Sequence, residues 1–155
     1  MLAETTLDMD SITTGAPRSI ARILPIIARI ALGLIFLVMG LNGFLQFLPQ
    51  PSTPVPARAM AFLGALYATG YMIPLVSGTQ VVVGVLLLTN RFVPLALALI
   101  APVIVNIILV HTFLAPMMLT LPVTVLVLEL YLAWAYRDAY RPMLTMRAAA
   151  RTTTR

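Results

Sequence analysis

The sequence contains no cysteine and no lysine, and it has a single histidine. Without cysteine the chain cannot form disulfides, thiol redox shuttles or thiolate metal sites. One histidine, His111, excludes bis-histidine haem ligation and a multi-histidine metal centre within one chain. We therefore expect no conventional metal or thiol redox centre in this protein and no covalently bound cofactor.

Charged residues are also scarce. They make up 10% of the 155 residues, whereas 61% are hydrophobic, and the mean hydropathy is +1.00. A soluble domain carries about a quarter charged residues, so the composition excludes a soluble enzyme. A membrane-spanning helix needs about 20 apolar residues, which leaves room for a few spans and no sizeable extramembrane domain.

All ten basic residues are arginines, against five acidic residues. They precede, separate or follow the apolar runs, which is the pattern of topology signals and of contacts with anionic lipid. With four spans, nine of the ten arginines lie on one side of the membrane and Arg58 alone lies on the other. We therefore expect both termini in the cytoplasm, membrane lipids as contacts, and no nucleic-acid partner.

The apolar runs predict an all-α fold, an integral membrane four-helix bundle with an additional short interfacial helix after the first span. A disordered cytoplasmic tail at 1–17 and a basic cytoplasmic tail at 143–155 flank a membrane domain at 18–142. The predicted spans are about 23–48, 73–88, 92–112 and 121–136, and the interfacial helix is about 57–69. Four prolines in residues 49–56 exclude a helix between the first span and the interfacial helix.

Small and polar residues fall on one face of each predicted span, which indicates the faces that meet in the bundle. Gly33, Gly40 and Gly43 share a face with Arg29 on the first span, and Ser77, Gln80 and Gly84 share a face on the second. We expect these small residues to allow a close approach of the two helices.

Arg29 and Glu129 form the predicted intramembrane charge pair. Arg29 lies about 9 Å from the start of its helix and Glu129 about 12 Å from the end of its own, both measured from the cytoplasmic side. One interpretation, which we favour, is a salt bridge that joins the first helix to the last. The other is a proton-handling carboxylate or an anion contact for a quinone head group.

A second polar group lies toward the opposite side and consists of Asn42, Gln46, Gln80, Asn106 and His111. One interpretation is hydrogen bonding between helices around Pro102, with His111 hydrated at the membrane interface. The sharper hypothesis is a small polar pocket under the proline-rich loop, where amides and one imidazole hydrogen-bond the carbonyls of a quinone or a similar lipophilic ring. His111 is the only ordinary proton carrier available there near neutral pH.

Several segments carry a resemblance to a known family. They are Gly40–Pro49, Thr69–Tyr71, Asn90–Pro94, Asn106 with His111, Leu128–Leu130 and Trp134–Asp138. Their order and spacing resemble the DoxX family of small bacterial integral membrane proteins over most of residues 25–142. Members often have a histidine where this chain has Gln46, which argues against proton or metal chemistry at that position.

The resemblance implies a four-helix bundle in the bacterial inner membrane and an association with quinone-linked redox systems. The first hypothesis is thus an accessory subunit of a quinone-linked electron-transfer complex, with a quinone or a lipid as its ligand. The second is a structural or assembly subunit of a larger respiratory or photosynthetic membrane complex, which contacts other subunits or a copy of itself. A third is a small transporter or lipophile-binding protein. In none of the three is the chain expected to be catalytic on its own.

Overall fold

The computed structural model describes residues 18–49 and 54–140. The predicted tails at 1–17 and 143–155 lie outside these residues. In chain order the elements are α1 (Arg18–Leu45), α2 (Ala57–Ala68), α3 (Met72–Leu88), α4 (Val93–Leu114), the short 3₁₀ helix η1 (Pro116–Met118), α5 (Thr120–Ala135) and α6 (Arg137–Tyr140). The described part of the chain is all-α, as the composition and the apolar runs predict.

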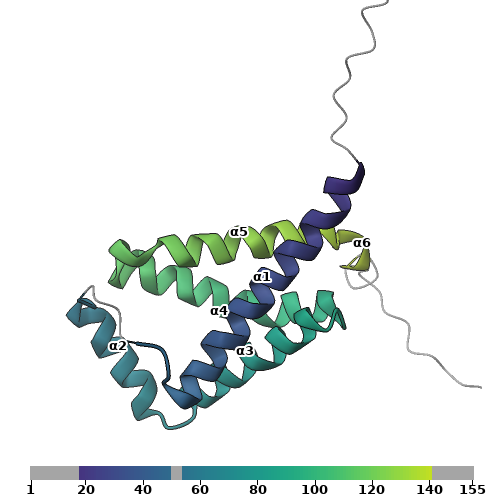
Figure 1. Ribbon diagram of the computed structural model, residues 1–155. Coiled ribbons are helices and arrows are strands. Elements are labelled where there is room, and N and C mark those ends of the chain that lie inside the picture. The colour runs from purple at the N-terminus through teal and green to yellow at the C-terminus, as the bar shows by residue number, and fades with distance from the viewer. Residues whose placement is uncertain (1–17, 50–53, 141–155) are drawn as a thin grey trace, which may run out of the picture.

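The four long helices pack as a bundle (Figure 1). The helix α1 packs along α3 over most of its length and also contacts α5, while α4 lies against both α3 and α5. The short helix α2 stands at one end of the bundle, and α6 lies at the other end, near the start of α1. We call these the α2 end and the α6 end of the bundle.

Close contact between α1 and α3 depends on glycine. A Cβ atom at Gly84 would lie 2.7 Å from the backbone nitrogen of Leu37, and one at Gly40 would lie 2.8 Å from the carbonyl oxygen of Ser77. Backbone atoms cannot move aside as a side chain can, so both positions exclude any larger residue at this helix separation. The small residues predicted to allow a close approach do so.

The centre of the bundle is apolar and closely packed. The largest fully buried side chains are Leu32, Phe36, Val83, Leu87, Leu97, Ile100, Ile104 and Leu132, which come from α1, α3, α4 and α5. Each helix therefore contributes one face to a single core, and this core separates the α2 end from the α6 end.

The outer surface of the bundle is apolar as well. Two helices are long and apolar enough to cross a membrane, namely Arg22–Leu45 within α1 and Val93–Leu114. In the most apolar 18-residue stretch of each helix, only 33% and 28% of the stretch, respectively, is buried inside the protein. The helices α2 and α3 form a pair bent by 92°, which adds a third candidate if the pair is one span. Since most of these apolar side chains face outward, the surface fits lipid, and two or three candidate spans indicate a multi-pass membrane protein.

Predicted and observed helices differ mainly at their ends. The helix α1 ends at Leu45, before the predicted end at 48, because Gln46 adopts a left-handed backbone with φ of +50°. The helix α5, predicted as the fourth span, has 16 residues. At 1.5 Å per residue it is about 24 Å long, which is less than the roughly 30 Å of the hydrocarbon core.

Candidate functional site

A cavity of about 510 Å³ lies toward the α2 end of the bundle. It has an almost entirely apolar lining, with two polar side chains, Gln80 from α3 and His111 from α4. The other lining residues are Ile35, Phe36, Met39, Ile107, Met118, Leu121, Pro122 and Val125. Ligand pockets for small molecules typically have about this volume and this combination of apolar walls with a few polar groups. We call it the His111 cavity.

A hydrogen bond within α4 determines the chemistry of the imidazole. His111 Nδ1 lies 2.8 Å from the carbonyl oxygen of Ile107, one turn earlier in the same helix. A carbonyl oxygen only accepts hydrogen bonds, so Nδ1 carries the ring hydrogen and donates a hydrogen bond to the carbonyl oxygen of Ile107. In the neutral ring Nε2 is then a free acceptor, and in the cationic ring it is a second donor.

The five residues of the predicted polar pocket do not converge on one cavity. Gln80 and His111 line the His111 cavity together, whereas Asn42 lies in the last turn of α1 and Gln46 directly follows that helix. There the side-chain oxygen of Asn42 accepts a hydrogen bond of 2.8 Å from the backbone N–H of Leu48. Asn106 is exposed on α4 and does not line the His111 cavity.

Arg29 and Glu129 are both buried in the bundle, with 7% and 6% of their surface exposed. Within the described residues no salt bridge joins them. The Nη1 of Arg29 instead donates a hydrogen bond to the carbonyl oxygen of Leu87, near the end of α3. The Nε of Arg29 and the Oε2 of Glu129 are each buried without a hydrogen-bond partner. Burying unpaired polar atoms is costly, so an acceptor would be stabilising at Arg29 Nε, and a proton or a donor would be stabilising at Glu129 Oε2.

A second cavity of about 410 Å³ lies beside Glu129 at the α6 end. Its wall consists of Leu97, Ala98 and Ala101 from α4, Glu129 and Ala133 from α5, and Arg137 and Tyr140 from α6. We call it the Glu129 cavity. Glu129 and Ala133 are four residues apart on α5 and therefore share a helix face, which is the signal for this part of the wall in the sequence.

Two side chains of α6 complete the Glu129 cavity. The hydroxyl of Tyr140 donates a hydrogen bond of 3.0 Å to the carbonyl oxygen of Pro94 in the first turn of α4, which ties α6 to the bundle. Partial burial raises the pKa of the Tyr140 hydroxyl, and the negative charge of Glu129 raises it further. Arg137 is held by the carbonyl oxygen of Trp134 at 3.1 Å and lies over the Trp134 ring, 4.8 Å from its centre.

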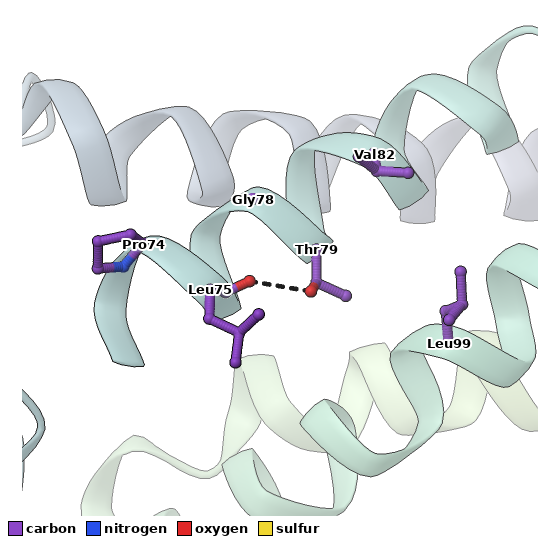
Figure 2. A pocket seen from close by; sticks show the side chains of 6 residues that line it. All are labelled: Pro74, Leu75, Gly78, Thr79, Val82 and Leu99. Carbon is purple, nitrogen blue, oxygen red and sulfur yellow. Dashed lines mark hydrogen bonds between the residues drawn. The ribbon is translucent and has the colours of Figure 1, made fainter. Parts of the chain in front are cut away.

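A third, smaller cavity of about 290 Å³ lies between α3 and α4 (Figure 2). It is lined by Pro74, Leu75, Gly78, Thr79, Val82 and Leu99. Its one hydroxyl, on Thr79, donates to the carbonyl oxygen of Leu75 at 2.9 Å, so no polar side chain there is free to orient a ligand.

Comparisons with known proteins add no assignment. No known protein family, curated protein or solved structure matches the chain. The likeness to the DoxX family thus rests on the segments quoted above alone. What the structure supports is a small all-α protein with two or three candidate membrane spans. Among the described residues no group of three or more His, Cys, Asp or Glu side chains could hold a metal ion.

Proposed function

We propose that this DoxX-like chain is an accessory subunit of a quinone-linked electron-transfer complex in the bacterial inner membrane, and that a quinone binds in the His111 cavity. The observation that carries the proposal is that Gln80 and His111, from different helices, line one otherwise apolar cavity of about 510 Å³. An apolar cavity with two polar groups suits a lipophilic ring that bears carbonyl oxygens.

The two polar side chains match both redox forms of such a ring. The amide nitrogen of Gln80 can donate a hydrogen bond to a carbonyl oxygen of the oxidised form. The Nε2 of His111 is an acceptor, because Nδ1 donates to Ile107, so it can accept a hydrogen bond or a proton from a hydroxyl of the reduced form. The quinone itself supplies the two-electron chemistry.

The electrons would pass to or from another protein. The sequence has no cysteine and one histidine, so it lacks the residues for a thiol pair or a bis-histidine haem. The role we propose is therefore to hold and protonate or deprotonate the ring beside a partner subunit.

The proposed topology has four crossings and both termini in the cytoplasm. Its support is that Arg29 on α1, Arg91 in the turn before α4 and Arg137 on α6 lie toward the α6 end. Two hydrogen bonds join these segments: Arg29 donates to Leu87 at the end of α3, and Tyr140 donates to Pro94 at the start of α4. An excess of arginine at one end marks the cytoplasmic side.

Binding of a short-chain quinone analogue to the full-length protein in mild detergent tests the proposal. We expect saturable binding that weakens by about fivefold in Gln80→Leu and in His111→Leu, since each removes one hydrogen bond worth about 1 kcal/mol. The matched control is Asn106→Leu, which removes an amide from α4 outside the cavity and should leave the affinity unchanged. Equal affinity in all four proteins, or no saturable binding, would contradict the proposal.

One observation favours the second candidate, an assembly subunit. Asn106 is an exposed amide on α4, the more apolar of the two long spans, and it has no hydrogen-bond partner among the described residues. An amide that faces lipid is costly, and amides of this kind often associate transmembrane helices. If assembly is the function, the wild-type protein will co-purify with partner subunits and will not bind the quinone analogue. Asn106→Leu will then abolish the co-purification.

A further inference from the structure

Glu129 has no role in the proposed quinone site. The residue has 6% of its surface exposed and lines a cavity of about 410 Å³. Its Oε2 atom is buried and has no hydrogen-bond partner. An ionised carboxylate in such an apolar setting needs a counter-charge or a proton, because burial removes its charge from water and Oε2 accepts no hydrogen bond.

Among the described residues, neither Arg29 nor Arg137 forms a salt bridge with Glu129. Arg29, on α1, donates to the carbonyl oxygen of Leu87 and forms no salt bridge with Glu129. Arg137 shares the cavity, but its guanidinium donates to the carbonyl oxygen of Trp134 and lies over that ring. The third titratable group, the hydroxyl of Tyr140, donates a hydrogen bond to the carbonyl oxygen of Pro94, and α4 contributes no titratable side chain to the wall. A proton is thus the simplest ligand that compensates the carboxylate.

The geometry also gives the proton one direction of access. The wall of the Glu129 cavity includes two residues of α6, the short helix that follows the last long helix. Toward the α2 end, the fully buried side chains of Ile100 and Ile104 on α4 and Phe36 on α1 fill the bundle. Exchange with water is therefore expected at the α6 end and not through the His111 cavity.

We propose that Glu129 is a proton-binding site that exchanges its proton with the α6 end of the bundle through the Glu129 cavity. The step is the transfer of a proton from a hydronium ion at that end to the carboxylate, which leaves a water molecule, and it needs no oxidant or reductant. This site is independent of the quinone proposal, because it uses other residues and another cavity.

Modification by the apolar reagent dicyclohexylcarbodiimide tests the proposal in the full-length protein. A carbodiimide adds to a protonated carboxyl group, and the product is located by mass spectrometry of the five acidic positions in the sequence. We expect modification at Glu129 whose rate falls by about tenfold per pH unit once the carboxyl ionises. Glu129→Gln should abolish this product.

Two cavity-filling variants retain the carboxyl and test the route. Ala98→Leu and Ala133→Leu add side chains to the wall of the Glu129 cavity. We expect both to slow modification of Glu129 by about tenfold or more, as a lost access path adds more than about 1.4 kcal/mol to the barrier. The matched control is Ala65→Leu on the exposed surface of α2. In this variant Glu129 should be modified at the wild-type rate.

Three results would overturn the proposal. They are no modification of Glu129 at any pH, a rate that does not change with pH, and equal rates in Ala98→Leu, Ala133→Leu and Ala65→Leu. If Glu129→Gln does not fold, the cavity-filling variants still decide the question, because they leave the carboxyl in place.

Discussion

Val125 and Glu129 lie on successive turns of α5, yet they line different cavities. Val125 belongs to the wall of the His111 cavity, and Glu129 belongs to the wall of the cavity at the α6 end. Residues four apart share a helix face and lie about 6 Å apart along its axis. One face of α5 therefore serves two sites, which the buried core keeps separate.

The first prediction is that the two sites can be inactivated independently. Glu129→Gln should leave the affinity for a quinone analogue within about twofold of wild type, a change of less than about 0.5 kcal/mol. His111→Leu should leave the rate of carbodiimide modification of Glu129 unchanged. Loss of both properties in either variant, in protein with wild-type helix content, would show that the sites are coupled.

The second prediction concerns the glycines of α3. Gly84→Ala should destabilise the protein by about 1–3 kcal/mol, because the added methyl group meets the backbone of α1 at Leu37 and Gly33. Gly78→Ala is the matched control on the same helix, since a Cβ there has no atom within 4 Å. It should leave the stability unchanged or raise it by up to about 1 kcal/mol. Unfolding in detergent, followed by circular dichroism, measures both, and equal effects would contradict the packing described.

The third prediction concerns the coupling between Arg29 and Glu129. The sequence favours a salt bridge, but the guanidinium bonds to Leu87 and no salt bridge joins the pair within the part of the chain described. Near neutral pH, a double-mutant cycle with Arg29→Met and Glu129→Gln should give a coupling energy within about 0.5 kcal/mol of zero, as for residues that share no direct contact. A favourable coupling energy of about 2 kcal/mol or more would instead indicate a salt bridge between Arg29 and Glu129.

The fourth prediction concerns pH and α6. The pKa of Tyr140 is raised in the folded protein, so the hydroxyl keeps its proton at a pH where the unfolded chain loses it. Its contribution to stability is thus complete below the unfolded value of about 10 and is lost as the pH rises through the folded value. Melting temperatures between about pH 9 and pH 11 should fall less steeply in Tyr140→Phe than in wild type. Parallel slopes for the two proteins would exclude this role of the hydroxyl.

Local features of the sequence predict much of the fold. Apolar runs of the right length predict the helices, and the helical period places Gly40, Ser77 and Gly84 on the faces where α1 meets α3. These features depend on residues close together in the chain, so no knowledge of the tertiary packing is needed to find them.

The candidate sites were harder to predict because they depend on contacts between distant segments. The hydrogen bond from Arg29 joins residues 58 positions apart, and the bond from Tyr140 to Pro94 joins residues 46 apart. Helical phase also could not show that Asn42 uses its side chain to bind the backbone at Leu48. A side chain that bonds to its own helix end is not available to a pocket.

Photochemical labelling with a light-activated quinone analogue tests the central claim most directly. If the quinone binds as proposed, the label will be found on the peptides that contain Gln80, His111 or Met118, and an excess of unlabelled quinone will displace it. Labelling that falls on Leu97–Ala101 or Glu129, or that persists with excess unlabelled quinone, would contradict the assignment of the His111 cavity as the quinone site.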